Sequence, residues 1–263
     1  MSFREERPGP IEIHTDYFRD APGDVTYGVA VTRSYGMAKG GGIFLPTAEA
    51  AAQHLIEASY TASGIIGDQE NVTDSLKVLD HMSERFVVMQ RKDEEDLADV
   101  FATVRLIHRE AGGLALPMEK NFPDVFSKID PLSCVEISQL YSFHTNKIVH
   151  QLGIYALLRA VYAYAQNINA STIVGMAEQV VLDMAQLIGI PSRDGLGDPI
   201  QKQEARDTKT RLHPLAFDVE EISRAYSSGE NDILNIYFDQ IGRHRGIGWF
   251  NSDLTKHLDY PSS

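Results

Sequence analysis

Three short runs of this chain are rich in apolar, β-branched and aromatic residues, which is typical of strands: 85–90, 100–107 and 135–141. A charged segment, 91–96, separates the first two runs, so we expect an antiparallel hairpin with a solvated turn. Charged residues nevertheless lie inside two of the runs, at Arg105 and Glu136. Because a buried charge is costly unless it is paired, these strands either hold an ion pair or border a polar site.

Helices and further strands alternate along the rest of the chain. A segment that is apolar almost all round, 151–165, predicts a helix buried against a sheet. Asp218, with Glu221 three residues later, is the expected N-cap of another helix. Strands followed by helix, strand and helix indicate a mixed α/β sheet. The remaining expected elements are helices over 46–58, around 122–126, over 179–188 and over 233–241, strands over 25–32 and 172–176, and loops over 143–149 and 246–249.

The length of 263 residues allows a large core, in one large domain or two small ones. Prolines and glycines break the beginning of the chain. We expect an N-terminal extension of uncertain structure over 1–45, a main domain over 46–225, and a C-terminal helical tail over 226–263 that packs on the main domain.

Composition and motifs argue against several classes of function. The formal net charge of −13 disfavours broad nucleic-acid binding, which requires a dense basic face. No apolar run approaches the roughly 20 residues that span a bilayer, and no secretory signal is evident, so a cytoplasmic location is expected. The histidines lack metal spacing, and the single cysteine, Cys134, excludes a Cys/His zinc pattern. Serine-hydrolase, dinucleotide-binding and Walker motifs are absent.

Strand periodicity assigns the candidate residues to faces. Side chains alternate with period two, which predicts two shared faces: Phe101, Thr103, Arg105 and Ile107 on one strand, and Glu136, Ser138 and Leu140 on the other. Two interpretations of Arg105 and Glu136 stay open. They form a structural ion pair, or the carboxylate orients or deprotonates an amine while the cation positions a substrate carboxylate.

Two features bear on anionic ligands. The loop over 143–152, just before Gly153, precedes a helix N-terminus whose backbone N–H groups can hold a phosphate of a diphosphate or phosphopantetheine group. A basic stretch is either a solvated loop or the local patch that an anionic ligand needs in so acidic a protein. Its members are Lys202, Arg206, Lys209 and Arg211.

Short motifs carry a resemblance to a known family over about residues 48–225. They are Asp80-His-Met-Ser-Glu-Arg-Phe, Thr103-Val-Arg-Leu, Glu136-Ile-Ser, Leu187-Ile-Gly-Ile-Pro, Gly197-Asp-Pro-Ile and Phe217-Asp-Val-Glu-Glu. In this order they resemble GNAT-fold acyltransferases related to N-acyl amino acid synthases and acyl-homoserine-lactone synthases. The sequence is most similar to the autoinducer-synthase-like acyltransferases of the PEP-CTERM/exosortase type. The resemblance implies a mixed, mainly antiparallel central sheet flanked by helices.

The resemblance also implies an activity, the transfer of a long-chain fatty acyl group from acyl carrier protein or acyl-CoA to the amine of an amino acid or similar small acceptor. The thioester is a co-substrate, and no permanently bound cofactor or metal is implied. By resemblance, Glu136 positions or deprotonates the amine, directly or through water, and Arg105 binds the acceptor or holds Glu136. Ser138 and Asp80 support the site, and Thr103 lies in the matching strand motif.

For the thioester, the resemblance implies a backbone N–H near Tyr141 to Phe143 that polarises the carbonyl group. Gly153 belongs to the run Gln151-Leu-Gly-Ile at the expected phosphate-binding loop, and the resemblance implies that the apolar strands and the helix over 151–165 wall an acyl tunnel. An acidic carrier protein would need a basic entrance, for which we expect Lys147, Arg159 and the 202–211 stretch.

Two positions depart from the family pattern. Gln139 stands where the family has arginine, and Lys77 stands where it has aspartate. Because lactone synthases use these positions, S-adenosylmethionine is a doubtful acceptor, and an amino acid or another amine is favoured. An acyl-homoserine-lactone (autoinducer) synthase and a catalytically silent GNAT-like binding protein remain the alternatives.

Overall fold

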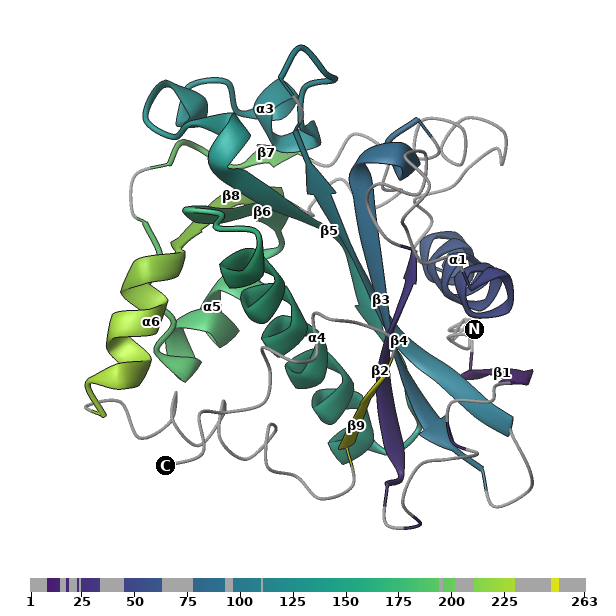
Figure 1. Ribbon diagram of the computed structural model, residues 1–263. Coiled ribbons are helices and arrows are strands. Elements are labelled where there is room, and N and C mark those ends of the chain that lie inside the picture. The colour runs from purple at the N-terminus through teal and green to yellow at the C-terminus, as the bar shows by residue number, and fades with distance from the viewer. Residues whose placement is uncertain are drawn as a thin grey trace, which may run out of the picture.

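The structure, a computed structural model, describes residues 9–14, 18, 23, 25–33, 45–62, 78–92, 97–109, 111–193, 196–201, 211–229 and 247–250. A sheet of nine strands forms the centre of this part of the chain (Figure 1). The strands are β1 (Ile11–His14), β2 (Tyr27–Arg33), β3 (Ser83–Arg91), β4 (Leu97–His108), β5 (Cys134–Ser142), β6 (Thr172–Ala177), β7 (Ile200–Gln201), β8 (Arg211–Asp218) and β9 (Ile247–Phe250). The helices are α1 (Pro46–Ala62), α3 (Pro117–Asn121), α4 (Lys147–Asn167), α5 (Gln179–Ile188) and α6 (Val219–Ser227), with short 3₁₀ turns η3 (Asp80–Met82), η4 (Val125–Ser127) and η5 (Pro131–Ser133).

The strand order is β7-β8-β6-β5-β4-β3-β2-β9, and β1 pairs with β4 beside this path. Only the β5–β6 and β2–β9 pairs of the described strands are parallel. The expected hairpin is present as β3 and β4. The prediction of a mixed, mainly antiparallel sheet flanked by helices is therefore confirmed.

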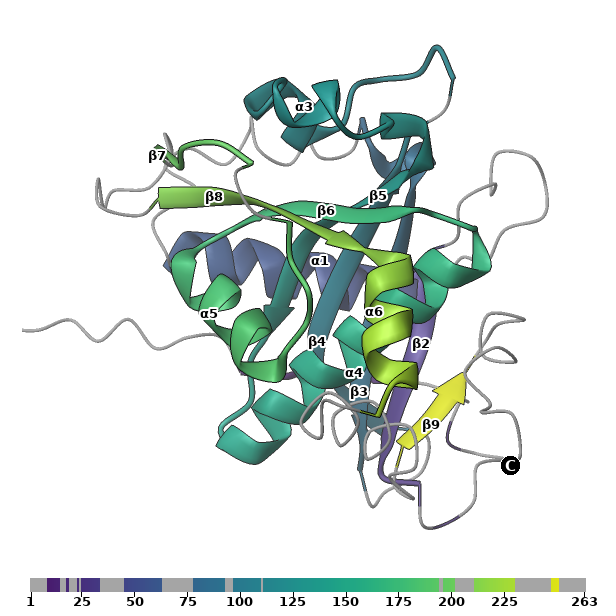
Figure 2. The same cartoon turned by 90° about the vertical axis from the view of Figure 1, so that its left-hand side faces the viewer.

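Helices cover both faces of the sheet. Figures 1 and 2 show α1 on one side and α4, α5 and α6 on the other, with α3 above one end. The core is divided accordingly, because one buried cluster lies under α1, a second under α4, and a third gathers around α3. Burial of these apolar side chains is the main term that holds the layers together.

Helix α4 is apolar almost all round, as predicted, and it packs on β3, β4 and β5. It begins at Lys147, earlier than predicted, because the side chain of Asn146 caps it by accepting the N–H of Ile148 at 2.9 Å. Gly153 consequently lies inside the helix. A Cβ atom there would come within 2.7 Å of Cε2 of Phe101 and 2.9 Å of Oγ of Ser142, so the glycine allows α4 to approach the sheet closely.

Three register shifts interrupt the alternation of side chains, and they change which residues share a face. The shift between β3 and β4 leaves Phe101 as an extra residue, and its ring packs on the α4 side. The shift between β4 and β5 falls at Gln139, whose φ of 52° is unusual for a residue other than glycine. The predicted faces are therefore wrong for Phe101 and Leu140, which lie on the α4 side, because one extra residue inverts the alternation.

Segments from both predicted flanking regions enter the sheet. Strands β1 and β2 belong to the segment 1–45, and β9 belongs to the segment 226–263. The loop predicted over 246–249 is wrong at Ile247–Phe250, which pairs in parallel with β2. The helix predicted over 233–241 lies outside the described residues, and the division into three segments stays a prediction. No helix in the described ranges has the length and apolar character needed to cross a membrane.

Candidate active site

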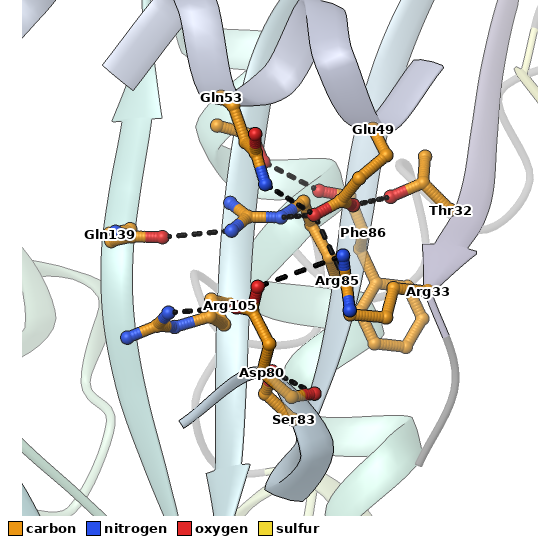
Figure 3. A network of polar contacts seen from close by, with 11 residues as sticks. Thr32, Arg33, Glu49, Gln53, Asp80, Ser83, Arg85, Phe86, Arg105 and Gln139 are labelled. Carbon is orange, nitrogen blue, oxygen red and sulfur yellow. Dashed lines mark hydrogen bonds and ion pairs between the residues drawn. The ribbon is translucent and has the colours of Figure 1, made fainter. Parts of the chain in front are cut away.

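Three arginines and a serine lie in a row across four adjacent strands. The strand register places them opposite one another in the order Arg33 (β2), Arg85 (β3), Arg105 (β4) and Ser138 (β5). The three arginines lie on the face that α1 covers (Figure 3). Neighbouring guanidinium groups repel one another, so this row requires carboxylates nearby.

Glu49 of α1 supplies the first carboxylate. Its Oε1 lies 3.0 Å from Nε of Arg85 and 3.2 Å from Nε of Arg33. The hydroxyl of Thr32 donates to its Oε2 at 2.8 Å, and Gln53 donates to Oε1 at 3.3 Å (Figure 3). Burial opposes the ionisation of Glu49, but Arg85, Thr32 and Arg33 outweigh it and lower the pKa below its ordinary value. Glu49 is therefore a buried anion that joins α1 to two strands.

Asp80 of η3 supplies the second carboxylate. Its Oδ1 lies 3.4 Å from Nη1 of Arg105, and its Oδ2 lies 3.7 Å from Nη2 of Arg33. The hydroxyl of Ser83 donates to the backbone carbonyl of Asp80 at 3.1 Å, so the Asp-x-x-Ser spacing fixes the turn. Burial, and then the neighbouring Arg85, lowers the pKa of Arg105 to about 10.

Glu136 of β5 lies on the same face as Arg105. Its partner in the register is Ile107, two residues beyond Arg105 on β4. It is 1% exposed, and both of its carboxyl oxygens accept the backbone N–H of Met118 in α3, at 3.2 and 3.0 Å. Burial raises the pKa of Glu136 to about 8, although the Met118 N–H and Arg105 act in the opposite direction. Arg105 forms an ion pair with Asp80, and Arg105 and Glu136 also influence each other electrostatically. A carboxyl group with this pKa can exchange a proton near neutral pH.

Strand β5 separates from β6 next to Glu136. Backbone pairing of the two strands runs from Cys134 to Ile137 in β5, although β5 continues to Ser142. Beyond Ile137 the residues Ser138 to Tyr141 are half-buried. Figure 2 shows that β6 and β8 cross the view at a steep angle to β5 and β4. The separation leaves one edge of β5 open in the middle of the sheet.

Gln139 lies at this edge and is tied to the arginine row. Its Oε1 accepts Nη2–H of Arg85 at 3.0 Å, so Arg85 reaches from β3 across β4 to β5 (Figure 3). The positive φ of Gln139 is thereby held by a buried side chain that is itself fixed by Glu49. The structure thus brings together the predicted residues Arg105, Asp80 and Ser138. Tyr141 lies opposite Thr103, the next pair that the β4–β5 register gives.

Three predicted contributions are placed differently. The N–H of Phe143 donates to the carbonyl of Phe101 at 2.8 Å, so it is engaged in the sheet and is not a free donor for a thioester. The fully buried hydroxyl of Thr103 donates to the carbonyl of Phe86 at 3.1 Å, which gives Thr103 a structural contact. Gly153 lies in helix α4 against Phe101 rather than in a phosphate-binding loop, because the cap at Asn146 starts the helix earlier.

The expected basic entrance is only partly described. Arg159 is buried on α4 and cannot belong to a surface patch, whereas Lys147 and Arg211 are exposed. Lys77 and the stretch 202–210 lie outside the described residues.

Burial raises the pKa of Cys134 to about 12, and its thiol donates to the carbonyl of Asp130, which does not suit a nucleophile. Among the described residues, no cluster of His, Cys, Asp and Glu side chains is arranged to hold a metal ion.

Glu49 and Arg85 were not predicted as site residues, although each leaves a signal in the sequence. Glu49 shares a helical face with the buried Ala52 and Ile56 at spacings of three and seven residues, so its burial follows from the period. Arg85 is the first residue of one predicted apolar strand, and Arg105 lies within another. Neither signal identifies the partner, which lies on another element.

Comparison with known proteins gives similarity to solved acyltransferase structures at low sequence identity. No protein-family model and no curated protein match the chain. The structure of FeeM, an N-acyl amino acid synthase from uncultured soil microbes, is 15% identical with a TM-score of 0.49, and the match covers 73% of this chain and 93% of FeeM. BjaI, a CoA-dependent acyl-homoserine lactone synthase determined with MTA, is 12% identical with a TM-score of 0.49 and coverage of 89% and 99%. The AHL synthase LasI is 15% identical with a TM-score of 0.46 and coverage of 80% and 91%. These neighbours are of the protein classes that the sequence motifs resemble.

Proposed function

We propose that this protein is an N-acyltransferase that moves a long-chain fatty acyl group from an acyl carrier protein or CoA thioester to the amine of an amino acid or similar small acceptor. The observation that carries the proposal is the position of Glu136. Its carboxyl group, with a pKa raised to about 8, lies two residues from Ser138, where β5 becomes an open edge.

An amine attacks a thioester only after it has lost its proton, which requires a nearby acceptor with a pKa close to the working pH. Glu136 in its ionised form takes this proton, through the Ser138 hydroxyl or a water, because the carboxyl group is buried under α3. The amine nitrogen then bonds to the carbonyl carbon, and the carbon–sulfur bond breaks. The departing thiolate receives the proton, so the products are an amide and a free thiol.

The open edge of β5 is the place for the thioester in this proposal. Backbone N–H groups along Ser138 to Tyr141 are the candidates to stabilise the oxyanion that forms on the carbonyl oxygen. On the α4 side, Ile137 and Leu140 are half-buried and pack on the apolar cluster, against which Tyr155 and Leu158 of the helix also pack. An acyl chain placed along these side chains leaves water, which favours its binding.

The test is product formation by the purified full chain. Acyl carrier protein and CoA thioesters of several chain lengths are incubated with each of the twenty amino acids, and products are identified by mass spectrometry. We expect an N-acyl amino acid, and we expect Glu136→Gln to lose most of the activity. Glu84→Gln is the matched control, because Glu84 is also a buried glutamate but lies in β3 on the opposite face, beside Tyr164 of α4. A lactone product formed from S-adenosylmethionine would replace the proposal by the synthase alternative. Equal turnover by Glu136→Gln would remove Glu136 from the reaction, and the lack of any acylated product would favour a binding protein.

A further inference from the structure

Strand β5 contains a bulge at the point where it leaves β6. Ser138 and Tyr141 are three residues apart on β5, but their partners on β4 are only two residues apart. Gln139 and Leu140 therefore lie opposite a single residue of β4, which makes one of them an extra residue. Backbone pairing of β5 with β6 ends at the residue before Ser138. The bulge thus coincides with the start of the open edge.

Gln139 has a backbone conformation in this bulge that suits glycine. Its φ of 52° is in the left-handed region, where a Cβ atom is crowded, and glycine is the usual residue in a bulge of this kind. Another residue keeps such a conformation only where contacts with the surrounding structure hold it. For Gln139 such a contact is the hydrogen bond that its Oε1 accepts from Nη2 of Arg85 at 3.0 Å (Figure 3).

Arg85 reaches Gln139 from β3, and it is anchored on α1 at the same time. Its Nε lies 3.0 Å from Oε1 of Glu49, and both side chains are almost fully buried. Glu49 in turn accepts the hydroxyl of Thr32 at 2.8 Å. One guanidinium group can make both contacts because Nε and Nη2 are separate donors in a rigid plane. The conformation of β5 at Gln139 is therefore tied to α1.

The bulge determines how β5 presents its groups beyond Gln139. Side chains alternate between the two faces of a strand, and one extra residue inverts the alternation beyond it. Leu140 accordingly packs on the α4 side, whereas Tyr141 lies opposite Thr103. The backbone N–H groups of the same residues are the candidates to stabilise the oxyanion in the proposed reaction, so their direction depends on the bulge as well.

We propose that Arg85 and Glu49 are positioning residues of the acyl transfer, which act through Gln139 by holding the bulge of β5 in its observed conformation. Neither residue needs to touch the acyl donor or the acceptor in this role. Without this hold, residue 139 relaxes toward negative φ, which turns the nearby N–H groups away from the thioester carbonyl. The inference rests on the proposed N-acyl transfer and adds residues that shape its site from another element.

Two substitutions of Gln139 test the hold on the bulge. Both Gln139→Ala and Gln139→Gly remove the hydrogen bond to Arg85, but only glycine adopts a positive φ without strain. We expect Gln139→Ala to lower kcat roughly tenfold or more, as expected when donors to an oxyanion are misplaced, and to leave KM for the acceptor unchanged. Gln139→Gly should recover most of the wild-type kcat. Initial rates at saturating thioester measure both constants.

Arg85→Lys tests whether Arg85 acts through Gln139. The lysine keeps a charge beside Glu49, but its single nitrogen cannot reach both partners, so kcat should fall as in Gln139→Ala. The double variant Arg85→Lys/Gln139→Gly should regain kcat, because glycine needs no hold. Asn169→Ala is the control for backbone strain alone. Asn169 has a φ of 55° and lies exposed in the turn after α4, so this variant should melt earlier with kcat unchanged.

The outcomes distinguish this inference from the proposed function. Equal kcat values of Gln139→Ala and Gln139→Gly, or no recovery in the double variant, would overturn the positioning role and leave acyl transfer intact. If the wild-type chain acylates no acceptor, the proposed function fails, and amide hydrogen exchange of the peptide over 134–142 tests the hold by itself. Faster exchange in Gln139→Ala than in Gln139→Gly would support the hold on β5, and equal or slower exchange would overturn it.

Discussion

Glu49 of α1 and Arg85 of β3 form a buried ion pair, with 3.0 Å between Oε1 and Nε and side chains that are 3% and 2% exposed. The pair is the connection between the helix and the arginine row, because Glu49 also accepts Thr32 and Arg33, while Arg85 also reaches Gln139. Removing one partner of a buried pair leaves the other charge uncompensated, which costs more than the pair itself contributes.

Glu49→Gln should therefore lower the free energy of unfolding by about 3 kcal/mol or more, as expected when a buried ion pair is broken from one side. Urea denaturation followed by circular dichroism measures the change. Glu57→Gln is the control on the same helix, because Glu57 is exposed, and a change within about 0.5 kcal/mol is expected there. Equal midpoints for wild type and Glu49→Gln would show that the buried charge is satisfied in another way.

Because of Glu136, the folded protein should lose stability as the pH rises. Its pKa is raised from 4.5 to about 8 by burial, so the folded state holds the proton more tightly than the unfolded state. The stability that this proton contributes is complete below the unfolded value and is lost as the pH rises through about 8. Glu136→Gln remains neutral, so it should gain stability relative to wild type between about pH 5 and about pH 9.

The measurement is the melting temperature of both proteins across this pH range. Glu84→Gln serves again as the comparison, since Glu84 is a buried glutamate on the opposite face of the sheet. A constant difference between wild type and Glu136→Gln at all pH values would mean that Glu136 does not carry the raised pKa.

Glu136 should also determine how kcat/KM of the proposed reaction depends on pH. Because the ionised carboxylate is the form that accepts a proton, kcat/KM should rise with pH and level off above about 8. Glu136→Gln should lose this rise and reduce kcat/KM by roughly a hundredfold or more, the usual contribution of a general base. Stopped assays that count acylated product at each pH test both parts. A profile that is flat in wild type, or unchanged in the variant, would exclude Glu136 as the base.

Gly153→Ala should destabilise the protein although alanine is a better helix former. The added Cβ would lie 2.7 Å from the fully buried Phe101 ring and 3.1 Å from Cβ of Ala102, so α4 must move away from the sheet. We expect a net loss of about 1 kcal/mol or more, because overpacking exceeds the gain in helix propensity. Gly9→Ala is a control without a neighbour within 4 Å of the new Cβ. A higher melting temperature of Gly153→Ala would show that α4 can shift freely.

The order of the main strands and helices could be predicted from the sequence, because periodicity and apolar runs are local properties. The hairpin of β3 and β4, the buried α4 and the N-cap at Asp218 all follow from neighbouring residues. The faces of β4 and β5 do not follow. Phe101 and Leu140 lie on the side opposite to that predicted, because a bulge depends on how two strands pair.

The sequence placed several candidate residues near one another, but it did not predict their contacts. Arg105, Glu136, Ser138 and Asp80 lie on one face or beside it, yet Arg105 pairs with Asp80 while Glu136 accepts the N–H of Met118. Such choices depend on η3 and α3, whose positions relative to the strands are not encoded in any short motif. The role of Glu49 was not predicted either, because its partners lie on other elements than α1.

The pairing of β2 with β9 has a consequence for synthesis of the chain. Residues Tyr27–Ala30 find their outer partner in Ile247–Phe250, which the ribosome delivers long after β2, β3 and β4. Until then β2 presents an unsatisfied row of backbone donors and acceptors, the kind of edge on which nascent chains associate with one another. Ribosome-bound intermediates of this protein should therefore depend on chaperones until the last strand arrives, even though the hairpin beside it can form early.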